Sequence, residues 1–127
     1  MGPSASPAGE PSRPPPEQAD ASHVSHLAVE QEGATLYLRP EGEFNRACGR
    51  RVEAVLDRIS ATLTRRVVFD LRGLSFLDLA GLKTILKANE RARTERFEVV
   101  VVRPRGHLNR IFTLTRAGER LTMIKRA

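Results

Sequence analysis

Residues 67–82 read Val67-Val68-Phe69-Asp70-Leu71-Arg72-Gly73-Leu74-Ser75-Phe76-Leu77-Asp78-Leu79-Ala80-Gly81-Leu82. The run from Arg66 to Leu71 is apolar and rich in β-branched residues with little alternation, which is typical of a strand covered on both faces. Residues 73–78 are expected to form a turn, and Asp78 is placed to cap a helix. The apolar stripe of that helix is expected to contain Leu82, Ile85, Leu86 and Asn89.

Two further segments precede this block. Residues 26–30 and 34–39 alternate in part between apolar and polar side chains and flank Gly33, which predicts a β-hairpin. The sequence Pro40-Glu41-Gly42 is expected to end the second strand. Apolar residues at helical spacing then predict a helix over residues 45–62, with Asn45 as its N-cap.

Three shorter elements follow the block. Residues 97–102 predict a second buried strand that Pro104 closes, and residues 108–115 predict a third helix that ends at Ala117-Gly118. Residues 121–124 fit a short edge strand. The predicted order is ββαβαβαβ, which indicates an α/β fold with a mixed central sheet and helices packed on it. The residues that we expect in its core are Val68, Phe69, Leu71, Leu82, Leu86 and Val100.

The N-terminal residues differ in composition from the rest. Residues 1–24 are rich in Pro, Gly, Ser and Ala, and they lack the apolar side chains that would offset the entropy of ordering. We expect a disordered tail over residues 1–24 and one domain over residues 25–127. Because the chain has neither a long apolar run nor the apolar core of a secretory signal, we expect no membrane insertion and a cytoplasmic location.

The net charge of +6 would suit an acidic protein, a nucleic acid or an anionic lipid surface. The basic residues are scattered along the chain, and one Tyr with no Trp leaves little for stacking on bases. We therefore expect no nucleic-acid partner. His23, His26 and His107 show no metal-ligand spacing with Cys48, and phosphate-binding loops and nucleophile elbows are not found. We expect no catalytic residue, no metal and no cofactor.

Three segments together resemble the STAS domain family, the module of sulphate-transporter tails and anti-sigma factor antagonists. They are the block over residues 67–82, the sequence Gly42-Glu43-Phe44-Asn45 before the first helix, and residues 105–115. The resemblance covers residues 26–126, and its fold has the element order predicted above.

The resemblance also implies a partner-binding surface. In that family an Asp-Ser-Ser/Thr-Gly-Leu turn opens the helix, and the residue after Asp accepts a phosphate from a partner kinase. Here the turn reads Asp78-Leu79-Ala80-Gly81-Leu82, so the hydroxyl is absent at Leu79. The implied partner-binding residues are Asn45, Asp78, Leu79, Ala80, Gly81 and Lys83.

Structural explanations exist for the same residues. Asp78 and Asn45 can serve only as helix caps, and Gly81 can serve only to bring the helix close to the sheet. Of the nearest hydroxyls, Ser75 is expected to make a local hydrogen bond in the turn, and Thr84 is expected to be exposed.

The resemblance implies a protein-binding regulator similar to an anti-sigma factor antagonist. Without the phosphate acceptor, it would be constitutive or serve as a scaffold. The implied partner is an anti-sigma factor or an ATPase-type serine kinase. The alternative is a soluble STAS subunit of a lipid or small-molecule ABC-type transport system, with a transporter ATPase as partner. A nucleotide or lipid held at the helix start is a third hypothesis.

Removal of residues 1–22 tests the tail. Because these residues are expected to bury no apolar surface, the truncated chain should unfold at nearly the same temperature as the full chain. Thermal unfolding followed by circular dichroism measures this, and a loss of several degrees would mean that the tail packs on the domain.

Overall fold

The computed structural model describes residues 26–59 and 63–125. The expected tail over residues 1–24, the end of the first expected helix and both ends of the expected domain lie outside the described residues. The elements in chain order are β1 (His26–Glu32), β2 (Thr35–Phe44), α2 (Arg46–Ile59), β3 (Arg66–Asp70), β4 (Leu74–Leu77), α3 (Leu79–Glu95), β5 (Glu98–Val102), the 3-10 helix η2 (Gly106–Asn109), α4 (Arg110–Leu114), the 3-10 helix η3 (Ala117–Glu119) and β6 (Thr122–Ile124).

The strands form one mixed sheet in the order β1-β2-β3-β5-β6. β1 and β2 pair antiparallel as the expected hairpin, whereas β2–β3, β3–β5 and β5–β6 pair in parallel. The α/β class and the mixed sheet are confirmed. The observed order differs from ββαβαβαβ by the extra strand β4 and by the 3-10 helices on either side of α4.

Strand β4 corrects the expectation of a turn over residues 73–78. Residues 74–77 pair in parallel with the last part of β2, with a register shift between Gly42 and Glu43. The sequence pattern did not reveal this strand, because it has only four residues and its inner two, Ser75 and Phe76, are exposed. Its pairing depends on a partner more than 30 residues earlier in the chain.

Strand β2 does not end at Pro40 as expected but continues to Phe44. It pairs with β3 over residues 35–38 and with β4 from Gly42 onward, so Pro40 lies between the two pairings. The Gly42 N–H donates to the Gly73 carbonyl on the β4 side at 3.2 Å. By the alternation of a strand, the Pro40 nitrogen faces that side too, where the ladder is interrupted and no donor is needed.

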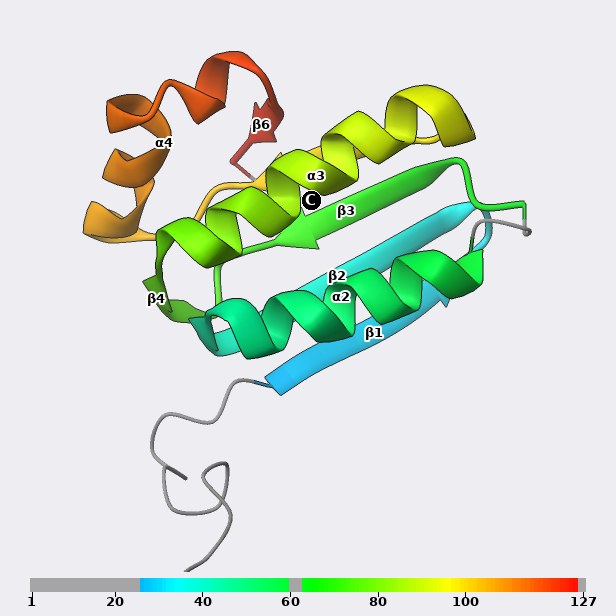
Figure 1. Ribbon diagram of the computed structural model, residues 1–127. Helices are drawn as coiled ribbons and strands as arrows, with labels where there is room; N and C mark the ends of the chain where they lie inside the picture. Colours follow the sequence, from blue (N-terminus) through cyan, green and yellow to red (C-terminus); the bar gives the residue numbers. More distant parts are fainter. Residues whose placement is uncertain (1–25, 60–62, 126–127) are drawn as a thin grey trace, which may run out of the picture.

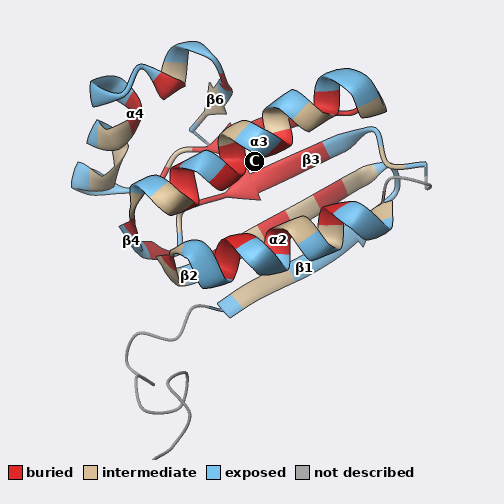
Figure 2. Ribbon diagram, in the orientation of Figure 1, coloured by how far each residue is buried: buried red, intermediate tan, exposed pale blue. Residues whose placement is uncertain are grey.

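Helices α2 and α3 lie side by side on one face of the sheet and begin at the same edge, where β2 and β3 end (Figure 1). The main core lies between these helices and the sheet, and β3 is buried along almost its whole length (Figure 2). Its largest fully buried side chains include Phe44, Phe69, Phe112, Leu38, Leu56, Leu71 and Ile85. Val68, Val100 and Val102 form a second apolar cluster.

The expected core is confirmed at five of its positions, which are Val68, Phe69, Leu71, Leu82 and Val100. Leu86 is only partly buried, at the margin of the main cluster. Asn89 lies at the margin as well, and its side-chain amide donates to the Arg120 carbonyl at 3.1 Å. The inner face of α3 therefore keeps Leu82 and Ile85 of the expected stripe and continues through Ala88 and Ala92 instead of Leu86 and Asn89.

The segment after β5 is less regular than expected. Instead of one helix over residues 108–115, it forms η2 and then the five-residue helix α4, and Ala117 begins η3. Phe112 anchors the segment in the main core. The expected edge strand is present as β6.

Asp70 holds the turn between β3 and β4. Its Oδ1 accepts hydrogen bonds from the backbone N–H and Nε of Arg72 at 3.2 and 2.9 Å, and its Oδ2 accepts one from Nη2 at 2.7 Å. Arg39 Nε lies 3.6 Å from the same Oδ2. The hydrogen bond from the Arg72 side chain is the main cause that lowers the pKa of Asp70, against the opposing effect of burial.

Helices α2 and α3 approach closely where Gly49 faces Thr84. A Cβ atom on Gly49 would lie 2.3 Å from Thr84 Oγ1, which is too close for any real contact. Thr84 is buried, and its hydroxyl donates to the Ala80 carbonyl at 3.2 Å. This corrects the expectation of an exposed Thr84: the small partner on α2 leaves room for it between the helices.

Replacing Asp70 by Asn tests the turn. At pH 7 the variant should be less stable by about 1–3 kcal/mol, since it loses charge-assisted hydrogen bonds. The pKa of Asp70 is lowered in the folded state, so its stabilising effect is complete above the pKa of an unfolded Asp, about 3.9. The difference from the parent should therefore shrink as the pH falls below about 4. Urea unfolding across pH measures it; a constant difference would contradict the assignment, and Glu98→Gln on an exposed ion pair is the control.

Gly49→Ala tests the helix contact. The variant should lose about 1–2 kcal/mol of stability although Ala is the better helix former, because the new methyl group overlaps Thr84. In the Thr84→Ala background the hydroxyl is gone, and the same change should cost much less. Denaturant unfolding of the two single variants and the double variant gives the coupling. Strictly additive effects would mean that the two side chains do not meet.

Candidate functional site

Helix α3 begins at the expected cap. Asp78 has extended backbone angles (φ −106°, ψ −177°), and its Oδ1 accepts a hydrogen bond from the Gly81 N–H at 2.8 Å. Asp78 therefore caps the first turn of α3, and Leu79 and Ala80 lie between the capping residue and Gly81, whose N–H donates to it. The capping role is confirmed.

Gly81 sets the position of α3 on the sheet. A Cβ atom at this residue would lie 2.3 Å from the Phe44 carbonyl oxygen and 2.9 Å from Leu77 Cδ1. The backbone oxygen cannot move aside without disturbing the end of β2, so a glycine is required. As a result, the first turn of α3 lies directly against the point where β2 ends and α2 begins.

Helix α2 begins with a similar cap. Asn45 follows β2 directly, and its Oδ1 accepts a hydrogen bond from the Cys48 N–H at 3.1 Å. Of the expected site residues, Asn45, Asp78 and Gly81 thus serve to place the two helix starts next to each other. Leu79, Ala80 and Lys83 line the surface that results.

Leu79 is the most prominent apolar residue of this surface. Its side chain is 58% exposed, at the first position of α3. Phe76, three residues earlier, is 46% exposed. Both are large apolar side chains, and they lie just before and at the start of one helix.

The two hydroxyl groups nearest to Leu79 in the sequence both form hydrogen bonds within the fold. Ser75 Oγ donates to the Gly42 carbonyl at 3.1 Å, which ties β4 to β2 across 33 residues of sequence rather than making the expected local bond. Thr84 is 7% exposed and bonded to its own helix. Residues 78–82 contain no hydroxyl group.

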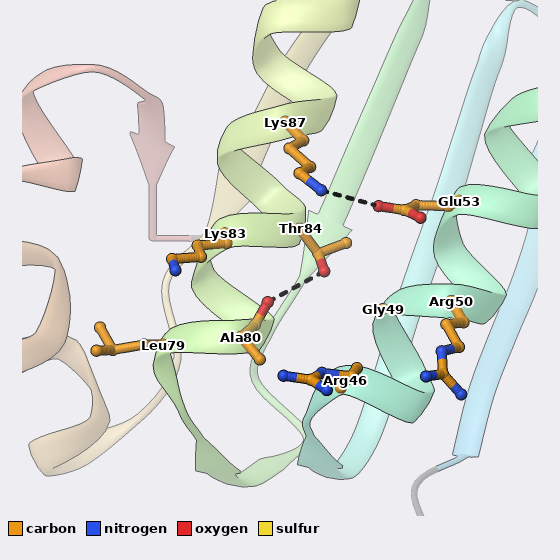
Figure 3. A pocket seen from close by; sticks show the side chains of 9 residues that line it. All are labelled: Arg46, Gly49, Arg50, Glu53, Leu79, Ala80, Lys83, Thr84 and Lys87. Carbon is orange, nitrogen blue, oxygen red and sulfur yellow. Dashed lines mark hydrogen bonds and ion pairs between the residues drawn. The ribbon is translucent and has the colours of Figure 1, made fainter.

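A groove of about 510 Å³ lies between the first halves of α2 and α3. We call it the α2–α3 groove; its lining residues are Arg46, Gly49, Arg50, Glu53, Leu79, Ala80, Lys83, Thr84 and Lys87. In Figure 3, Arg46 reaches from α2 toward Ala80, while Leu79 and Lys83 point to the other side of α3. The surface therefore continues from α2, across the groove, to the outer side of α3.

Sequence reasoning identified Lys83 and missed the other cations of the groove. The available signal was spacing: Arg46 and Arg50 on α2, and Lys83 and Lys87 on α3, are each four residues apart and so share one side of a helix. Because α2 and α3 are separated by two strands in the sequence, only their packing shows that the two pairs line one groove.

The groove is strongly positive. Four cationic residues and one carboxylate line it, and that carboxylate, Glu53, lies 4.0 Å from Lys87. The first turns of α2 and α3 contain no acidic residue. At the start of α3 the capping carboxylate of Asp78 offsets part of the positive end of the helix dipole, whereas the cap of α2 is the neutral Asn45.

A second hollow of about 390 Å³ lies at the turn after β3. Its lining residues are Arg39, Pro40, Glu41, Asp70, Arg72, Gly73 and Arg105. Asp70 engages two of its three arginines, and Arg39 also pairs with Glu30 at 2.6 Å. This hollow is a structural ion-pair network, and the α2–α3 groove is the stronger candidate site.

Within residues 26–59 and 63–125, no three His, Cys, Asp or Glu side chains come together as metal ligands would. Cys48 is buried in the main core and packs there as a small apolar side chain. None of the described helices combines the length and the apolar character needed to cross a membrane.

The fold was compared with known proteins. The anti-sigma factor antagonist SpoIIAA in its unphosphorylated form superposes with a TM-score of 0.66 at 15% identity, covering 80% of this chain and 90% of that one. An anti-sigma factor antagonist from Mycobacterium paratuberculosis gives 0.66 at 23% identity, covering 78% and 84%. A sulfate transporter family protein from Wolinella succinogenes gives 0.57 at 20% identity, covering 76% and 81%. At these identities, the likeness concerns the fold.

A comparison with curated proteins found no match. The family model of the STAS domain matches residues 26–126, which include every described strand and helix. Since this match spans most of the chain and the solved structures share its fold, the chain belongs to the STAS domain family.

Proposed function

We propose that this chain is a non-enzymatic, cytoplasmic, protein-binding regulator of the anti-sigma factor antagonist kind. It docks on its partner, an anti-sigma factor or ATPase-type serine kinase, through the starts of α2 and α3. One observation carries the proposal: Leu79 is exposed directly after Asp78, which caps α3. In the turn of the STAS family described above, this position carries Ser.

In this proposal the residues of the surface have two roles, positioning the helix starts and contacting the partner. Asn45, Asp78 and Gly81 fix the two helix starts through caps and close packing. Leu79, Ala80 and Lys83 contact the partner. An exposed leucine on a capped helix start offers apolar area whose backbone is already ordered, so that binding costs less conformational entropy there.

The regulation follows from the missing hydroxyl group. A phosphate would add about −1.5 to −2 charges to the docking surface and weaken an apolar contact. Residues 78–82 cannot accept one, and Ser75 and Thr84 hold hydrogen bonds within the fold. The proposed complex is therefore constitutive, or the chain is a scaffold whose binding is controlled through the partner.

Affinity capture with the full chain as bait identifies the partner. Recovery of an anti-sigma factor or serine kinase supports the proposal. Recovery of a transporter ATPase instead would support the transport alternative, in which the STAS domain is a soluble subunit of an ABC-type system.

Leu79→Glu tests the docking surface. A carboxylate at the first helical position is favourable for α3, so the thermal stability should be unchanged or slightly higher. Binding of the captured partner should weaken by about 2 kcal/mol or more, because a charge enters an apolar contact. Isothermal titration calorimetry on the folded variant measures the difference.

The matched control is Leu63→Glu. Leu63 is also highly exposed but precedes β3, away from the helix starts. This variant should bind like the parent. If Leu79→Glu also keeps the parent's affinity, the start of α3 is not the docking surface and the proposal fails.

A further inference from the structure

We infer that the α2–α3 groove binds an acidic segment of the partner protein, with carboxylates set against Arg46, Arg50 and Lys83 and an apolar side chain against Leu79. The inference rests on the proposed function, since it states the chemistry of the partner that docks at the helix starts. It is carried by the uneven charge along the two helices.

In the second half of the contact between α2 and α3, the positive charge of Arg91 is neutralised by carboxylates of the same two helices. Arg91 of α3 bonds Asp57 of α2 at 2.8 Å and Glu95 of its own helix at 2.7 Å. These carboxylates are the main cause that raises the pKa of Arg91. Here the chain supplies its own acidic partners for the cation between the helices.

The first half lacks such compensation. Arg46, Arg50 and Lys83 form no ion pair or side-chain hydrogen bond with any residue of the described part of the chain. Arg46 is the first residue of α2, where the helix dipole disfavours a cation, and Arg50 and Lys83 follow in the second turns of their helices. An arrangement that costs stability but concentrates positive charge around a groove is what an anionic partner would use.

The side chains that line the groove favour a protein segment over a small anion. The cationic side chains that line it are exposed and long, and Thr84, the hydroxyl at its base, is committed to Ala80. The groove therefore offers spread positive charge and no preformed cluster of donors. Leu79 and Lys83 lie four residues apart on one side of α3, so a segment reaching across the groove meets both charge and an apolar contact.

The first test uses a synthetic probe and the full chain. The probe is a 12-residue peptide of alternating Glu and Asp with one central Leu, and its control replaces every acid by Gln or Asn. In amide chemical-shift titrations by NMR, the acidic peptide should perturb residues 46–53 and 79–87 and the neutral peptide should not. Its affinity should fall at least tenfold between 50 and 300 mM salt.

Charge-reversal variants test the residues. Arg50→Glu and Lys83→Glu should each weaken peptide binding and binding of the captured partner at least fivefold. Arg65→Glu is the matched control, since it makes the same charge change on an exposed residue just before β3. An equal loss in Arg65→Glu would mean non-specific attraction to a basic protein and would overturn the inference.

Other occupants are outcomes of the same experiment. Inorganic phosphate, ATP or vesicles of anionic lipid that shift these amides while the acidic peptide does not would overturn the inference. The inference would also be overturned if Leu79→Glu lost partner binding while Arg50→Glu and Lys83→Glu kept it. That result would support the docking surface of the proposed function but not an acidic segment in the groove. If all three variants bind the partner like the parent, the proposed function itself fails.

Discussion

The contact between Gly81 and the Phe44 carbonyl is the constraint on which the rest of the site depends. With no Cβ atom at residue 81, the first turn of α3 can rest on the backbone at the end of β2. Since α2 begins immediately after that point, the two helix starts become neighbours. The exposed Leu79, the groove and its cations are all consequences of this single close approach.

The sequence predicted the features that depend on local chemistry. Asp78 and Asn45 cap their helices because a side-chain oxygen two or three residues before a free N–H needs no distant partner. The hairpin around Gly33 and the buried strand at residues 66–70 follow from turn chemistry and apolar runs in the same way. The resemblance to STAS domains was carried by residues 42–45, 67–82 and 105–115, and the family match confirms it.

The features that depend on distant partners were not predicted. Pro40 is tolerated inside β2 because the ladder changes from β3 to β4 at that point, which no local pattern records. Thr84 is buried because Gly49, on another helix, leaves space for it. The groove was not predicted for the same reason. Arg46 and Arg50 form a cationic groove with Lys83 only because α2 and α3 pack side by side. For the candidate site, the sequence identified the helix start with Leu79 but not the width of the surface.

The close packing of Gly49 on Thr84 has a consequence for how a signal could pass through the domain. A methyl group at Gly49 would already overlap the Thr84 hydroxyl, which is bonded inside its own turn, so the two helices cannot move closer together at this point. A molecule bound above them would therefore meet a preformed surface. Its binding would change which side chains remain accessible rather than the packing of the two helices beneath.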